Sequence, residues 1–132
     1  FIPLFKIIRD LFDRKILGLS AFIYTLAHLL LYILDNNISV KYLYTDVSNL
    51  LYIQVGYIAF LLFLPLVFTS TIKAKLVLKN NWFKIHRLIY IIIPLSFIHY
   101  YLIIKADYLL FFIYLITFIL ILILKNRIIS NE

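Results

Sequence analysis

The fold is decided by residues 16–34, ILGLSAFIYTLAHLLLYIL, which contain no Asp, Glu, Lys or Arg. An α-helix needs ~17–25 consecutive apolar residues to cross the ~30 Å hydrocarbon core of a bilayer. Three more stretches reach this length, at about residues 50–72, 86–104 and 108–124. All four are apolar on every face, so they lack the alternating pattern of a membrane β-barrel. The sequence therefore predicts an all-α fold, a polytopic transmembrane helical bundle with these four spans.

The composition of the chain supports the same conclusion. Hydrophobic residues make up 65% of the 132 residues and charged residues 14%, against ~45–50% and ~25% in soluble domains. The chain has no Cys and no Met, which excludes disulfides, thiolate metal sites and methionine axial ligands within it. It begins with Phe1, and residues 1–5, FIPLF, resemble the end of another apolar helix. We therefore expect residues 1–132 to be one membrane domain from a bundle of five or six helices.

Basic side chains are concentrated in the segments on one side of the predicted spans. Lys and Arg number 13 and the net charge is +7, but the charges lie in short connections, which indicates topology rather than nucleic-acid binding. One side carries 11 of them: Lys6, Arg9, Arg14, Lys15, Lys73, Lys75, Lys79, Lys84, Arg87, Lys125 and Arg127. The other side carries Lys41 and Lys105. The positive-inside rule therefore places the first side, with the C-terminus, in the cytoplasm, and residues 35–49 outside.

The three histidines, His28, His86 and His99, all lie within or at the edge of predicted spans. Ionisable residues there are costly and often functional, although a histidine can also serve as a polar contact between helices. His28 and His99 lie about 18 Å and about 20 Å from the cytoplasmic starts of two parallel helices. Two imidazoles at one height can hold the iron of a b-type heme between them. His86 lies about 20 Å lower, where it could hold a second heme or face the lipid headgroups.

Two features near the histidines admit both a functional and a purely structural interpretation. Pro94 lies between His86 and His99, and we expect a kink or π-type adjustment there that turns both rings toward the bundle interior. Small side chains lie on the faces around the histidines and would leave room for a porphyrin, or serve only in helix packing. These are Ala21, Thr25, Gly56, Ala59 and Ser96. Trp82 is expected to be an interfacial anchor, and Arg14 and Lys15 to contact lipid headgroups or a phosphate-bearing cofactor.

Three blocks of the sequence resemble the MsrQ (YedZ) family of heme-binding subunits of methionine sulfoxide reductase systems. Residues 14–32, RKILGLSAFIYTLAHLLLY, are similar to a family signature of a basic pair, Leu-Gly-Leu and a histidine, here His28. Residues 68–90, FTSTIKAKLVLKNNWFKIHRLIY, are similar to the Thr-Ser-Thr…Trp-x-x-Leu-His block, with Ile85 in place of Leu and with His86. Residues 94–105, PLSFIHYYLIIK, are similar to the block that holds the third histidine, His99.

This resemblance implies a ferric-reductase-like transmembrane domain that binds heme b in the bacterial inner membrane. Such subunits pass electrons from the cytoplasmic side or the quinone pool to MsrP, a periplasmic molybdenum enzyme that reduces methionine sulfoxide in proteins. By position, His28, His86 and His99 are the expected heme-iron ligands. The family also uses FMN, and Arg14 and Lys15 stand where its basic pair is implicated in flavin binding, with Lys15 in place of the common second Arg.

Two other functions remain open at this point. The chain could belong to another branch of the same superfamily, a metal or oxygen reductase, which usually carries a cytoplasmic flavin- and nicotinamide-binding domain. It could instead be a non-redox membrane scaffold or a proton-handling subunit, although no Asp or Glu lies within the predicted spans. This segment contains no soluble domain, so if it is a redox protein we expect it to relay electrons rather than to complete a reduction alone.

Overall fold

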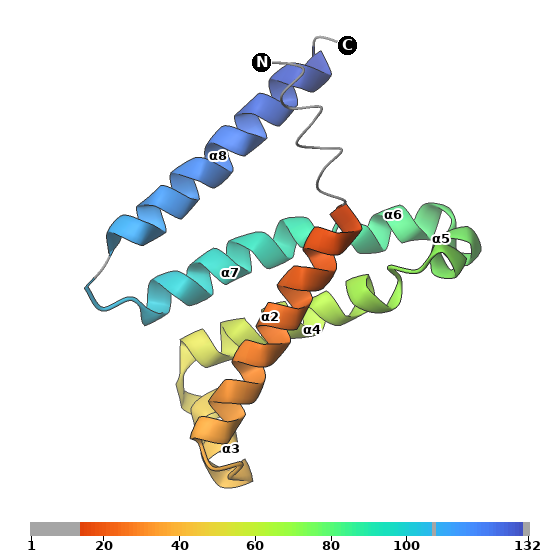
Figure 1. Cartoon of the computed structure of the whole chain (residues 1–132). Helices are drawn as coiled ribbons and strands as arrows, with labels where there is room; N and C mark the ends of the chain where they lie inside the picture. The colour runs from red at the N-terminus through yellow and green to blue at the C-terminus, as the bar shows by residue number, and fades with distance from the viewer. Residues whose placement is uncertain (1–13, 107, 131–132) are drawn as a thin grey trace.

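The computed structural model describes residues 14–106 and 108–130, and these residues form helices joined by short connections (Figure 1). The helices are α2 (Arg14–Asp35), α3 (Val40–Asn49), α4 (Leu51–Phe68), α5 (Ile72–Leu78), α6 (Asn80–His86), α7 (Ile89–Ile103) and α8 (Tyr108–Ser130). No strand occurs in this part of the chain. The predicted all-α fold is confirmed. The further helix expected at residues 1–5 lies outside the described residues.

Among the described residues, three helical segments are long and apolar enough to cross a membrane, namely Lys15–Asp35, Leu51–Phe68 and Asn80–Ile103. A fourth apolar helical stretch, Tyr108–Leu124, is shorter. Large apolar side chains on these helices are exposed at the molecular surface; Leu31, for example, is 66% exposed and Leu109 71%. Apolar exposure on this scale suits a protein surrounded by lipid and not one surrounded by water. The chain is therefore a membrane protein, as the composition predicted.

The second predicted span ends earlier in the structure than the sequence suggested. We expected it to reach residue 72, but α4 ends at Phe68. The Thr69 hydroxyl donates to the Pro65 carbonyl oxygen at 2.6 Å, and the Ser70 hydroxyl to the Leu66 carbonyl oxygen at 2.6 Å. Hydroxyl side chains that bond to backbone in this way compete with the helical ladder. Thr71 then begins the separate helix α5, which was not predicted, by accepting a hydrogen bond from the Ala74 N–H.

The third predicted span, 86–104, is interrupted, but not at Pro94 where we expected a local adjustment. Helix α7 continues through Pro94, and the interruption lies at Arg87 and Leu88, between α6 and α7. Backbone hydrogen bonds to the third preceding residue, such as Leu88 N–H to the Ile85 carbonyl oxygen at 3.0 Å, tighten the chain there. Such 3₁₀-type turns rotate the chain more per residue than an α-helix does. A membrane helix can continue through a proline, which removes one backbone donor, and the kink expected at Pro94 stays a prediction.

Helix α4 is the centre of the described bundle. Helix α7 packs along it most extensively, and α2 packs against it from another side. Phe63, Leu66 and Ile92 form the buried core between α4 and α7, and Phe22 of α2 packs against it. Helix α8 turns back from α7 at an open angle (Figure 1) and contacts it through aromatic rings such as Phe111. This core occupies the C-terminal half of α4 and leaves the N-terminal half to face a cavity.

Candidate functional site

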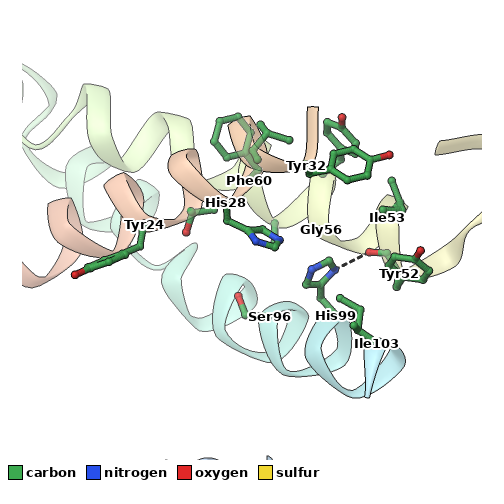
Figure 2. Close-up of a pocket in the computed structure, with 14 residues that line it drawn as sticks. Tyr24, His28, Tyr32, Tyr52, Ile53, Gly56, Phe60, Ser96, His99 and Ile103 are labelled. Atoms are coloured by element: carbon green, nitrogen blue, oxygen red, sulfur yellow. Dashed lines mark hydrogen bonds between the residues drawn. The ribbon is translucent and has the colours of Figure 1, made fainter. Parts of the chain in front are cut away.

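A cavity of about 440 Å³ lies between α2, α4 and α7 (Figure 2). Its lining is mostly apolar and aromatic: Tyr24, Thr25, His28, Leu29, Tyr32, Tyr52, Ile53, Gly56, Tyr57, Ala59, Phe60, Ser96, His99 and Ile103. Cofactor sites are typically apolar cavities of ~300–1,000 Å³ with a few polar groups that fix the ligand. The size and lining of this cavity therefore suit a cofactor.

Two of the three histidines meet across this cavity. His28 extends from α2 and His99 from α7, with their imidazole centroids 6.2 Å apart and their planes at 81° (Figure 2). Their agreement in height, which the sequence predicted, is present in the structure. Within the described residues, no group of three His, Cys, Asp or Glu side chains could hold a bare metal ion. The arrangement is therefore a facing pair of imidazoles and not a polydentate ion site.

The orientation of the His99 ring is fixed by a backbone carbonyl group. His99 Nδ1 lies 2.7 Å from the Tyr52 carbonyl oxygen at the start of α4. A carbonyl oxygen can only accept, so Nδ1 carries the proton and donates it, and Nε2 of the neutral ring keeps its lone pair. Metal-binding imidazoles commonly donate their other ring N–H to a carbonyl or carboxylate in this way. The tautomer of His99 is thus the one a metal ligand requires.

Gly56 allows the His99 ring to lie against α4. A Cβ atom at position 56 would lie 2.7 Å from His99 Cε1 and 2.9 Å from His99 Nδ1. Real Cβ atoms essentially never approach other heavy atoms so closely, so any residue larger than glycine would displace the imidazole. Of the small residues noted in the sequence, Gly56, Thr25, Ala59 and Ser96 do line the cavity, whereas Ala21 does not.

His86 lies at the other end of α4, away from the cavity. Its Nε2 is 3.1 Å from the Thr69 hydroxyl oxygen, and that hydroxyl gives its single proton to the Pro65 carbonyl oxygen at 2.6 Å. Thr69 must then accept from His86, so Nε2 of His86 carries a proton. Since Tyr52 and Thr69 mark opposite ends of α4, His99 and His86 are separated by about 25 Å along it, at ~1.5 Å per residue. The structure therefore brings together two of the three predicted ligands and leaves the third apart.

Trp82 belongs to the His86 cluster. Its indole stacks on the His86 ring at 4.0 Å between centroids, and its Nε1–H donates to the Thr69 carbonyl oxygen at 2.9 Å. The Lys75 ammonium lies 5.1 Å from the centroid of the indole, within cation–π range. Trp82 thus helps to join α6 to the end of α4, besides any role as an interfacial anchor.

Arg14 and Lys15 open helix α2, and Lys15 is exposed in its first turn. Lys15 does not line the cavity. Their expected contact with a flavin stays a prediction.

Several lining residues were not singled out from the sequence, and each of them lies one helical turn from a residue that was. Tyr24 and Tyr32 lie one turn to either side of His28, Tyr52 and Phe60 one turn to either side of Gly56, and Ile103 one turn after His99. Residues four apart share a helix face, so this rule would have found them. The Tyr52 carbonyl group, in contrast, has no signal in the sequence.

The fold and this site define an integral membrane protein whose helices pair two histidines over an apolar cavity. The chain belongs to the family described as ferric reductase like transmembrane component, whose profile matches residues 7–97. The resemblance drawn from the sequence is thereby confirmed.

Curated relatives of the chain carry the name protein-methionine-sulfoxide reductase heme-binding subunit MsrQ. The chain is 38% identical over 97 residues to the protein from Caulobacter vibrioides, which covers 72% of this chain and 46% of the relative. It is 39% identical over 95 residues to that from Xanthomonas oryzae pv. oryzae, covering 71% and 44%, and 35% identical over 106 residues to that from Rhizobium meliloti, covering 75% and 49%. The chain thus spans about half the length of these relatives. No solved structure matches it.

Proposed function

We propose that this chain forms the heme b site of a membrane electron-transfer subunit, in which the imidazoles of His28 and His99 would hold the heme iron. The single observation that carries the proposal is the facing pair of imidazoles, 6.2 Å apart between centroids, across a cavity of about 440 Å³.

The separation of the two rings fits one metal atom between them. An imidazole nitrogen binds a first-row metal at about 2 Å, so two rings that share the metal have centroids about 6 Å apart. Heme bound here would supply reversible one-electron chemistry, with a potential set by its ligands and surroundings. The chain's own residues orient the ligand and shape the site: the Tyr52 carbonyl group fixes the His99 tautomer, and Gly56 admits the ring. The lining of the cavity is mostly apolar.

We assign the electron path from similarity to the curated relatives, which are named as heme-binding subunits of a methionine sulfoxide reductase. The chain would take electrons from the quinone pool or a cytoplasmic flavin reductase and pass them to a periplasmic molybdenum-dependent reductase of the MsrP type. Its location would be the bacterial inner membrane, with the 11 basic residues on the cytoplasmic side.

Two finer assignments remain predictions beside this one. His86 was predicted either to ligate heme iron or to face the lipid headgroups. Its Nε2 donates a hydrogen bond to Thr69, and ligation through that nitrogen would require this bond to break. FMN contact at Arg14 and Lys15 would use the positive charge at the beginning of α2, where helix N-termini favour phosphate.

The electron path can be tested with the full-length protein in proteoliposomes. The heme is reduced with a quinol, the periplasmic reductase is added in its oxidised form, and the b-type absorbance is followed. We expect the reductase to reoxidise the heme, and His28→Ala proteoliposomes to show no such signal. Reoxidation by a ferric chelate or dioxygen but not by the reductase would assign the chain to another branch of its family. A protein that lacks heme in its native membrane would support the scaffold function instead.

A further inference from the structure

We propose that helix α3 lies in the membrane–water interface at the outer end of the bundle, with Tyr42 and Tyr44 among the lipid headgroups. The proposal does not depend on heme binding, because it rests on the faces of α3 and on its attachment to the spanning helices. The partner of this surface is the lipid bilayer itself.

Helix α3 has four distinct sides. Leu43, Asp46 and Val47 are partly buried and face the bundle. Lys41, Thr45 and Ser48 are exposed, and they lie on the opposite face of a helix with ~100° per residue. Tyr42 and Tyr44, 62% and 75% exposed, lie about 100° to either side of Leu43. The helix therefore presents a bundle face, a polar face and an aromatic flank on each side.

Two hydrogen bonds hold α3 to the ends of spanning helices. The Tyr32 hydroxyl of α2 donates to Asp46 Oδ2 at 2.7 Å, and Gln54 Nε2 of α4 donates to the Val47 carbonyl oxygen at 2.9 Å. Figure 1 shows α3 at the end of the molecule where α2 ends and α4 begins. Because these helices cross the membrane, the bonds place α3 at the level where both leave the hydrocarbon core.

The connection from α2 to α3 is a turn held by backbone hydrogen bonds. The Ile38 N–H bonds to the Ile33 carbonyl oxygen and the Asn37 N–H to the Leu34 carbonyl oxygen, the pattern of a Schellman motif. Asn37 and Ile38 have φ of 53° and 55°, a backbone conformation that isoleucine adopts rarely. The direction in which α3 leaves α2 is thus fixed by backbone hydrogen bonds.

The aromatic flanks continue the lipid-facing surface of the neighbouring spans. Leu31 and Leu34 of α2 and Leu51 of α4 are 66%, 59% and 60% exposed, and Val40 at the start of α3 is 78% exposed. Tyrosine is enriched where the hydrocarbon core meets the headgroups, since its ring is apolar and its hydroxyl polar. An amphipathic helix with this pattern lies in the plane of the interface. The polar face then points to water, and the tyrosines extend sideways into the headgroups.

The depth of each face can be measured with single cysteines, because the 132 residues contain none. Tyr42→Cys and Tyr44→Cys report the flanks, Thr45→Cys and Ser48→Cys the polar face, and Ile23→Cys the middle of a span, where Ile23 is 63% exposed. Each is introduced into the full-length protein, labelled with an environment-sensitive fluorophore and reconstituted in phosphatidylcholine vesicles. Quenching is compared between aqueous iodide, a nitroxide near the headgroups and a nitroxide deep in the acyl chains.

We expect the shallow nitroxide to quench positions 42 and 44 at least twofold more than the deep one, iodide to dominate at 45 and 48, and the deep nitroxide to dominate at 23. Iodide quenching of 42 and 44 equal to that of 45 would overturn the proposal and mark the flanks as water-facing, as a soluble partner requires. If the deep nitroxide quenched positions 42 and 44 as strongly as position 23, the proposal would also be overturned, because the two positions would then lie in the hydrocarbon core. Each flank carries one labelled position and the polar face two, so flank and polar face can still be compared if one of these variants fails to fold.

Discussion

His28 and His99, from two helices that both pack on α4, hold their imidazole rings 6.2 Å apart with the ring planes at 81°. Both rings line the cavity, and Gly56 of α4 lies against the His99 ring. This relationship leaves room for one metal atom between the rings, and it makes the site sensitive to small changes in the neighbouring side chains.

Gly56→Ala is expected to weaken heme binding, because the added Cβ would lie 2.7 Å from His99 Cε1. Overpacking of this kind costs about 1–3 kcal/mol, which corresponds to an affinity about 5- to 150-fold lower. Heme titration of the purified apoprotein measures the change.

Gly18→Ala is the matched control, since nothing lies within 4 Å of a Cβ at that position. This variant should bind heme as the parent does, and helix α2 should gain about 0.5–1 kcal/mol. Equal heme affinity of both alanine variants would contradict the role assigned to Gly56.

Thr25→Leu is expected to reduce heme content by filling part of the cavity while both histidines are kept. Thr25 lines the cavity, and its hydroxyl bonds only to the Ala21 carbonyl oxygen of its own helix. Ala27→Leu adds a large side chain to the same helix at an exposed position that does not line the cavity. Heme content per protein should fall at least severalfold in the first variant and stay unchanged in the second. A fall in both would indicate a general effect on α2.

The Tyr32–Asp46 hydrogen bond is expected to stabilise the attachment of α3. A hydrogen bond to a charged group contributes about 1.5–3 kcal/mol, and less where water reaches it. Tyr32→Phe, Asp46→Ala and the double variant form a double-mutant cycle, with thermal unfolding in detergent as the measurement. We expect a coupling of about 1 kcal/mol. Additive effects of the two single changes would show that the bond does not contribute.

Thr69→Val is expected to destabilise the fold while leaving the heme spectrum unchanged. The change removes the acceptor of the His86 Nε2–H, and an unsatisfied donor at a partly buried site costs about 1–2 kcal/mol. Thr69→Ser keeps the hydroxyl and should restore the melting temperature. If Thr69→Val altered the heme spectrum as well, His86 would be coupled to the iron and the separation of the two sites would be wrong.

The class of fold and the pairing of His28 with His99 could both be predicted from the sequence, for physical reasons. Apolar stretches long enough to span a bilayer have few alternatives to helix, and equal depth along parallel helices was enough to pair His28 with His99. Tyr32 and Tyr52 were accessible to the same reasoning through their helical spacing from His28 and Gly56.

Other features depended on contacts that a sequence does not display. Helix α4 ends at Phe68 because hydroxyl groups bond to its last carbonyls, although the apolar character continues to Ile72. The tautomers of His99 and His86 follow from a backbone carbonyl and a threonine supplied by α4 and its C-cap. Helix α3 was expected only as an outer loop, because its apolar side is short and its attachment comes from Asp46 and Gln54.

The most direct test is the reduced-minus-oxidised absorbance spectrum of membranes that contain His28→Ala, His99→Ala or His86→Ala in the full-length protein at equal protein level. We predict that the first two variants each lose the same b-type band, and that His86→Ala keeps it. A band that survives in His28→Ala or His99→Ala, but disappears in His86→Ala, would contradict the assignment of the heme to the His28–His99 pair.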